Sequence, residues 1–192
     1  FQNEDPSKLI SELINISDPK LSSETVFILP EGILSSLNLE NLQRLKNLFS
    51  NNFSKKHKIV LGMNIYEDQK IYNSLLVLDN NVEILDMYYK NKLVPFGEFL
   101  PFETFLNKLG FKKITEGNFS FSNGAEQKNI LIDNLNILPL ICYEIIFTEL
   151  IQQGSKNTNL IINISEDGWF GESIGPHQHF AKAIFRSIEA NS

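Results

Sequence analysis

The chain has 192 residues, 42% of them hydrophobic, and carries a formal net charge of -6 with a pI near 5.1. A chain of this length and hydrophobic content can bury one sizeable core, and we expect a single domain over residues 1–192. The acidic balance, with one short basic run at residues 55–58, gives nucleic-acid binding no electrostatic basis. We therefore expect no nucleic-acid partner.

No stretch reaches the roughly 18 consecutive apolar residues that a membrane-spanning helix needs, and the polar start FQNEDPSK is not typical of a signal peptide. Because the sequence opens on Phe1 and stops directly after a helical pattern, we expect it to be a piece of a longer protein. The one cysteine, Cys142, excludes an internal disulfide. It is either a small buried side chain or a reactive thiol.

The first half of the chain predicts one strand, one helix and three further strands. The run TVFILP at 25–30 is apolar and stopped by proline, which is typical of a strand buried on both faces. A helix is expected over 38–50, where apolar residues recur every three or four positions: Leu39, Leu42, Leu45, Leu48 and Phe49. Three strands follow, the last two joined by an Asn-Asn hairpin, at residues 58–66, 73–79 and 82–89.

The second half begins with a loop-rich region at 90–128, which is too long for a plain connection and indicates a functional loop. A hairpin-like strand and an apolar strand ending at Cys142 come next, then a buried strand at 159–165. The last predicted element is a helix over 176–190, which carries on one face Phe180, Ile184 and Ile188. This order of elements predicts an α/β domain in which helices cover a mixed sheet.

Three polar residues follow apolar strands, where open α/β sheets build their sites: Glu31, Lys90 and Cys142. Taken singly, such residues are more often exposed loop charges or a core thiol. Together they supply the parts of an acyl-transfer site. A carboxylate takes the thiol proton, the thiolate attacks a carbonyl carbon, and an ammonium group stabilises the resulting oxyanion.

The order Glu, Lys, Cys, in the settings LPEG, YYKNKLVPFGEFLPFE and ICYEIIF, resembles the nitrilase or carbon-nitrogen hydrolase superfamily. Within it, the blocks LVPFGEFLPF and DGWFGESIGPHQHFAKAIFRSIE are similar to the apolipoprotein N-acyltransferase family. The likeness runs from about Thr25 to the end of the chain. It implies a nitrilase-like αββα sandwich of mixed sheets covered by helices, here expected to be incomplete at both ends and without the family's flanking transmembrane helices.

Carried over residue by residue, the resemblance implies that Glu31 is the general base, Lys90 the oxyanion stabiliser and Cys142 the nucleophile. It also implies supporting roles for Glu98, Tyr143 and Glu144. Lys90 and Glu98 share a loop that Pro95 and Pro101 stiffen. A carboxylate beside the lysine would keep its ammonium group protonated.

The activity implied is transfer of an acyl chain from phospholipid, through a cysteine thioester, to the α-amino group of the N-terminal diacylglyceryl cysteine of lipoproteins. It needs no cofactor, and the family resemblance places it at the periplasmic face of the bacterial inner membrane. Two alternatives stay open at this point. One is a soluble amidase or nitrilase that hydrolyses small carbon-nitrogen bonds, and the other is a catalytically inactive remnant.

Apolar residues near the site have two interpretations each. An amphipathic fragment is either an interfacial lid over the membrane surface or ordinary core: Phe102, Phe105, Leu106, Leu109 and Phe111. Trp169 and Phe170 are either part of an acyl-binding wall or a buried aromatic pair. The pair His177 and His179 suggests zinc, but without an identifiable third ligand we expect no metal and assign the pair to capping or packing.

Overall fold

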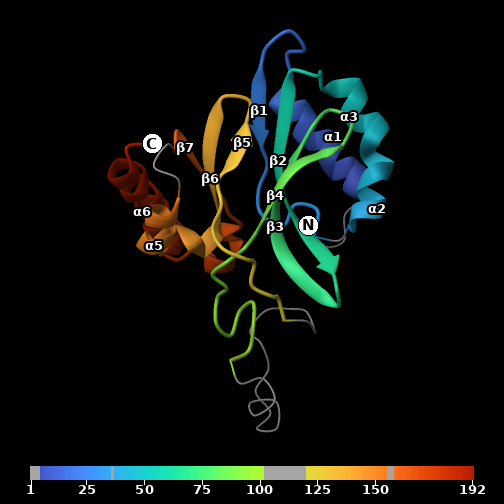
Figure 1. The fold of residues 1–192 in the computed structure, drawn as a ribbon. Coiled ribbons are helices and arrows are strands. Elements are labelled where there is room, and N and C mark those ends of the chain that lie inside the picture. Colours follow the sequence, from blue (N-terminus) through green and yellow to red (C-terminus); the bar gives the residue numbers. More distant parts are fainter. Residues whose placement is uncertain (1–4, 36, 102–119, 155–157) are drawn as a thin grey trace.

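The computed structural model describes residues 5–35, 37–101, 120–154 and 158–192. Two mixed sheets lie face to face, and helices cover the outer face of each one (Figure 1). The strand order is β1-β2-β3-β4 in the first sheet and β5-β6-β7 in the second. The described part of the chain is therefore a layered arrangement of helix, sheet, sheet and helix.

The first sheet is built around a long central hairpin. Its strands are β1 (Thr25–Ile28), β2 (His57–Glu67), β3 (Lys70–Leu78) and β4 (Ile84–Tyr89). β1 runs parallel to β2, and the other two pairings are antiparallel. Successive residues of β2 point to opposite faces, so Ile59 and Leu61 pack beneath the helices while Val60 faces the second sheet. Both faces of this strand are therefore buried.

The second sheet is shorter, and its strands are β5 (Ile130–Ile132), β6 (Leu135–Ile141) and β7 (Leu160–Ile164). β5 pairs antiparallel with β6, and β6 pairs parallel with β7. Between the sheets, Val77 and Tyr88 of the first pack in one cluster with Ile137 and Ile162 of the second. This inter-sheet core fixes the positions of the carboxyl ends of β4 and β6 relative to each other.

The helices form the two outer layers. The first sheet is covered by α1 (Pro6–Ser17), α2 (Leu39–Leu42) and α3 (Lys46–Asn52), with a 3-10 turn at Gln43–Leu45. The second is covered by α5 (Thr148–Gln153) and α6 (Gly175–Ala190), with 3-10 turns at Cys142–Ile146 and Asp167–Phe170. Arg186 of α6 donates from Nε to the Ile145 carbonyl at 3.1 Å, which fastens this helix to the first of those turns.

The predicted strands and helices are present, with boundaries that differ by a few residues. The helix expected over 38–50 is α2, the 3-10 turn and α3, and Leu42, Leu45 and Phe49 are buried as its periodicity predicts. Helix α1 was not predicted. Asp5 caps it by accepting from the Ser7 N–H, and it buries three apolar residues: Leu9, Ile10 and Ile14.

One expectation was wrong. β1 is not buried on both faces, because it is the outermost strand of the described sheet and Ile28 is 52% exposed. On α6, the predicted apolar face of Phe180, Ile184 and Ile188 is exposed, whereas the buried residues of this helix are His179 and Arg186. The apolar fragment expected as a lid lies outside the described residues.

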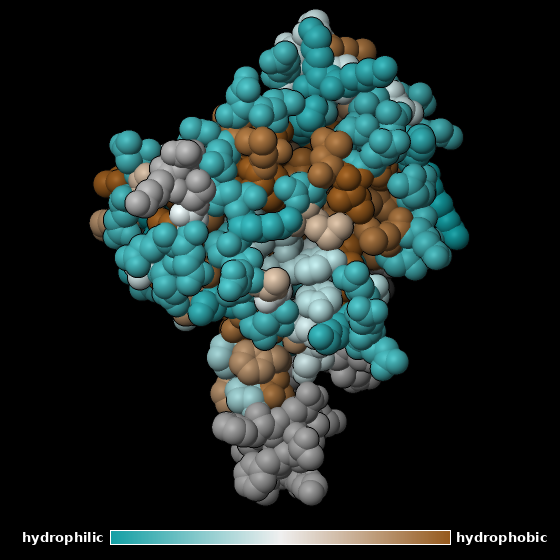
Figure 2. Space-filling view, in the orientation of Figure 1, coloured by the Kyte–Doolittle hydropathy of each residue, from teal (hydrophilic) through white to brown (hydrophobic). Residues whose placement is uncertain are grey.

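The surface in Figure 2 is largely hydrophilic on the face shown, and its hydrophobic residues gather over the strands. Among the described residues, none of the helices has both the length and the hydrophobicity required to span a bilayer.

Replacing Phe49 by Ala should lower the free energy of unfolding by about 3–5 kcal/mol, because a fully buried ring would leave a cavity beneath α3. Urea denaturation followed by circular dichroism measures this loss. The exposed neighbour Asn47→Ala is the matched control and should change stability by about 0.5 kcal/mol at most. A loss below about 1 kcal/mol for Phe49→Ala would contradict this packing.

Candidate active site

Glu31 follows β1 on a turn that is held against β2. The Gly62 N–H donates to the Pro30 carbonyl at 3.2 Å, and a Cβ on Gly62 would lie only 2.6 Å from the Glu31 Cα. Only glycine allows this approach. The carboxylate itself is buried and accepts from Asn73 Nδ2 at 2.8 Å on Oε1 and from the Glu166 N–H at 3.0 Å on Oε2. Both oxygens of Glu31 are therefore fixed.

Lys90 follows β4 and is 1% exposed, although it carries an ammonium group. Its Nζ donates to Glu98 Oε1 at 2.8 Å and lies 3.4 Å from Glu31 Oε1. Burial alone would lower the pKa of Lys90, but the two carboxylates outweigh burial and raise it above its ordinary value. The side chain thus stays charged in the interior.

Glu98 and Asn73 complete the surroundings of Lys90. Glu98 Oε2 accepts from the Val94 N–H at 2.9 Å, so the loop that carries this carboxylate also orients it. Asn73, on β3, donates from Nδ2 to both glutamates, at 2.8 Å to Glu31 and 3.0 Å to Glu98. One amide group therefore holds the two carboxylates on either side of the ammonium.

Cys142 follows β6 in a strained conformation, with φ at 54°. Burial and the negative charge of Glu31 raise the pKa of the thiol to about 11, while Lys90 and a hydrogen bond with Ser165 oppose the rise. The thiol also forms a hydrogen bond with Glu31. Near neutral pH the sulfur is therefore protonated and lies beside a carboxylate that can receive its proton.

Glu144 is a fully buried carboxylate that connects the Cys142 turn to the Lys90 loop. Its Oε1 accepts from the Tyr88 hydroxyl at 2.9 Å and from the N–H groups of Asn91 and Lys92 at 2.7 and 2.9 Å. Its Oε2 accepts from the Ile141 N–H at 2.9 Å. Burial raises the pKa of Glu144, and these donors oppose the rise.

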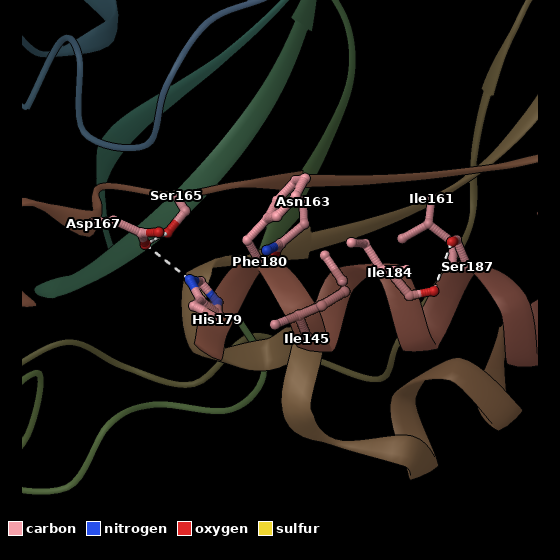
Figure 3. A pocket seen from close by; sticks show the side chains of 10 residues that line it. Ile145, Ile161, Asn163, Ser165, Asp167, His179, Phe180, Ile184 and Ser187 are labelled. Carbon is pink, nitrogen blue, oxygen red and sulfur yellow. Dashed lines mark hydrogen bonds and ion pairs between the residues drawn. The ribbon is translucent and has the colours of Figure 1, made fainter. Parts of the chain in front are cut away.

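A second polar group lies beside the backbone of Cys142, and Figure 3 shows its side chains. Ser165 and Asp167 follow β7 and face His179, which projects from α6. His179 Nδ1 lies 2.8 Å from Asp167 Oδ1, and Nε2 lies 3.0 Å from the Cys142 carbonyl oxygen. These side chains form one end of a cavity of about 430 Å³ between β7 and α6, whose other walls are mostly apolar.

The remaining predicted residues lie at the edge of the site. Tyr143 is 37% exposed, with its ring edge-on to Phe147. Trp169 and Phe170 are exposed on a 3-10 turn, so they are not a buried aromatic pair, and their role in binding an acyl chain stays a prediction. Within the described residues there is no group of three or more His, Cys, Asp or Glu side chains that could hold a metal ion.

Comparison with known proteins gives the relationship of this chain. The family model described as carbon-nitrogen hydrolase matches residues 29–191, which include the turn of Glu31, the loop of Lys90 and Cys142. The chain belongs to the carbon-nitrogen hydrolase family.

Curated relatives in sequence include proteins named apolipoprotein N-acyltransferase. The chain is 42% identical over 121 residues to the apolipoprotein N-acyltransferase of Rhodopseudomonas palustris, covering 62% of this chain and 23% of that protein. It is 35% identical over 195 residues to the protein of that name from Wigglesworthia glossinidia brevipalpis, covering 98% of this chain and 39% of the relative. The chain therefore spans well under two thirds of the length of the curated relatives it matches.

Solved structures show the same fold. A carbon-nitrogen hydrolase from Helicobacter pylori G27 superposes with a TM-score of 0.63 at 17% identity, covering 98% of this chain and 66% of that one. A carbon-nitrogen hydrolase superfamily protein from Xanthomonas campestris gives 0.64 at 15% identity, covering 97% and 67% of the two chains. The nitrilase-like α/β fold expected from the sequence is confirmed.

Several residues of this candidate site escaped the sequence reasoning. Asn73 did not stand out, because β3 also contains the polar residues Lys70 and Ser74. Ser165 and Asp167 follow β7 as Glu31 follows β1, so the rule that sites form at strand ends could have found them. Nothing in the sequence indicated that His179 would face Cys142, because α6 is separated from β6 by about one fifth of the chain.

Replacing Glu144 by Gln should destabilise the chain by about 1–3 kcal/mol. The carboxylate accepts hydrogen bonds from buried N–H and hydroxyl groups, whereas the glutamine NH2 would place a donor against one of these donors. Thermal unfolding measures the effect. Glu149→Gln, which changes a partly exposed carboxylate nearby, is the matched control. Equal stability of both variants would contradict the bridging role of Glu144.

The thiol of the folded chain should react with iodoacetamide at pH 8 more slowly than in urea, by on the order of a hundredfold, because its pKa is raised to about 11. In the folded state the rate should rise with pH towards that value. Glu31→Gln removes a charge that disfavours the thiolate and should shift the profile to lower pH. Equal rates in the folded and unfolded chains at pH 8 would rule out the raised pKa.

Proposed function

We propose that this chain is the catalytic part of an N-acyltransferase that acylates lipoproteins. The observation that carries the proposal is the meeting of Glu31, Lys90 and Cys142 in one buried charged group, within a chain similar over 98% of its length to a protein named apolipoprotein N-acyltransferase. The name of the relative supplies the reaction. The geometry supports this reaction, because a thiol, a carboxylate and a cation lie together.

In the first half-reaction, Cys142 attacks the ester carbonyl of a phospholipid acyl chain. Glu31 takes the thiol proton as the carbon-sulfur bond forms, and Lys90 stabilises the negative charge that develops on the carbonyl oxygen. The carbon-oxygen bond then breaks, and the proton passes from Glu31 to the departing alkoxide. The products are a thioester on Cys142 and a lysophospholipid.

In the second half-reaction, an α-amino group attacks the thioester carbonyl. The acceptor is the diacylglyceryl cysteine at the N-terminus of a lipoprotein. Glu31 receives a proton from the attacking nitrogen and returns one to the departing sulfur, which leaves an amide and a free thiol. Lys90 acts on the second oxyanion as on the first, because Glu31 and Glu98 keep it charged.

Glu98, Glu144 and Tyr143 have supporting places in this scheme. Glu98 holds the Lys90 ammonium at 2.8 Å, and Glu144 keeps the Lys90 loop beside the nucleophile. Tyr143 supplies the peptide N–H that follows Cys142. Trp169 and Phe170, exposed near the site, offer an apolar surface for an acyl chain.

The place of action that fits this reaction is the periplasmic face of the bacterial inner membrane, where both lipid substrates are found. The proposal treats residues 1–192 as one catalytic domain that works with membrane-embedded parts.

A soluble amidase has less support, because the likeness to solved hydrolases is below 20% identity and shows the fold alone. The intact group of charged partners around Cys142 argues against a catalytically inactive remnant.

Incubation with phosphatidylethanolamine vesicles should add one acyl chain to Cys142, and intact-mass spectrometry measures the gain. The adduct should be removed by hydroxylamine, which cleaves thioesters, and should be missing from the Cys142→Ala variant. When a diacylglyceryl-cysteine peptide is then added, the acyl group should move from Cys142 to the peptide. A folded chain that gains no acyl mass, but hydrolyses small amides, would contradict the transferase and favour the amidase.

A further inference from the structure

His179 is a buried residue of α6 whose ring nitrogens both have partners close to Cys142. Its Nε2 lies 3.0 Å from the Cys142 carbonyl oxygen, which can only accept, so this nitrogen carries a proton. Its Nδ1 faces Asp167 Oδ1 at 2.8 Å. The ring therefore lies between an acid on one side and the nucleophile's backbone on the other.

Ser165 adds a further contact to this group. Its hydroxyl donates to Asp167 Oδ1 at 2.5 Å, so its one proton is directed to the acid that also faces His179. Figure 3 shows these three side chains together, and His179 connects them to the Cys142 carbonyl. Glu31 and Lys90 act on the sulfur of Cys142.

The backbone of Cys142 needs such support. Its φ of 54° lies in the left-handed region, which is unfavourable for a residue with a side chain. A residue keeps this conformation only where its surroundings impose it. The hydrogen bond from His179 acts directly on the carbonyl group of this residue, so it supports the strained turn at the point where the chain reverses.

We propose that His179 is a positioning residue for the nucleophile, acting through the peptide bond between Cys142 and Tyr143. Because a trans peptide directs its C=O and N–H to opposite sides, the bond from His179 turns the Tyr143 N–H away from α6. It also fixes the direction in which the Cys142 side chain leaves the backbone. This inference rests on the proposed acyl transfer, since it assigns His179 to the same nucleophile.

The matched variants His179→Gln and His179→Asn separate this role from packing. The glutamine amide nitrogen occupies a position like Nε2 and can still donate to the Cys142 carbonyl. The asparagine amide nitrogen occupies a position like Nδ1, so it can contact Asp167 but does not reach Cys142. Both replace the ring by a smaller amide, so a purely structural role predicts similar losses from the two.

The measured reaction is acylation of Cys142, the chain's one cysteine, by p-nitrophenyl butyrate. Released p-nitrophenolate gives its rate, and intact-mass spectrometry detects the acylated chain. This ester tests attack by Cys142 without lipid or lipoprotein. We expect His179→Gln to retain the wild-type rate constant within about threefold and His179→Asn to lose about tenfold or more, as for one lost hydrogen bond. The ester concentration for half-maximal rate should stay unchanged. His177→Asn, at an exposed neighbouring position, should match the wild type.

Circular dichroism and thermal unfolding establish that each variant is folded. If both His179 variants are folded and acylate at the wild-type rate, or lose activity equally, the positioning role is overturned. Should His179→Asn not fold, His179→Gln decides alone, because a tenfold loss in that folded variant contradicts the proposal. Normal acylation by the small ester without any acyl gain from vesicles would instead contradict the lipid function and leave the His179 result standing.

Discussion

The site depends on one buried cation. Lys90 is almost fully removed from water, and an isolated ammonium group in that environment would lose its proton or destabilise the fold. Glu31 and Glu98 prevent this, and they come from the end of β1 and from the loop after β4. The same ion pairs that keep Lys90 charged therefore bring together two segments that are about 60 residues apart in the chain. Asn73 adds the central strand β3 to this group by donating to both carboxylates.

The charges around Cys142 favour a neutral thiol until a substrate arrives. Two carboxylates and one ammonium lie close together, and burial adds to the charge of Glu31 in raising the pKa of the sulfur. A neutral thiol is poorly reactive towards most electrophiles. In the proposed reaction, the proton of the attacking sulfur neutralises Glu31, and the positive charge of Lys90 then faces the new oxyanion. Proton transfer would thus occur in the same step in which the cation stabilises developing negative charge.

Local patterns predicted most strands and helices and pointed to Glu31, Lys90 and Cys142 at strand ends, whereas the sandwich of two sheets and the roles of these residues came from the family resemblance. Buried strands such as 58–66 show as apolar runs, and a polar residue directly after such a run identifies a strand end. The positions of Asn73 and His179 could not be predicted in this way, because their contacts arise from the packing of β3 and α6 against distant turns. Helix α1 was missed because its start was read as a polar terminus, although Asp5 and Pro6 are a typical helix beginning. The exposure of Phe180 on α6 shows that an apolar stripe indicates a helix face, without indicating what covers it.

Two acids, the buried Glu144 and the partly exposed Asp167, support the turn of Cys142 by different means. Glu144 binds backbone N–H groups on the turn of Cys142 and on the loop of Lys90, so it fixes the distance between nucleophile and cation. In the role proposed for His179, Asp167 contacts that ring and thereby supports the direction of the nucleophile. If both act as the geometry indicates, loss of Glu144 should lower stability and reactivity together, because its donors are buried. Loss of the His179 bond should lower reactivity more than stability, because it holds a single carbonyl group at the end of an already packed strand.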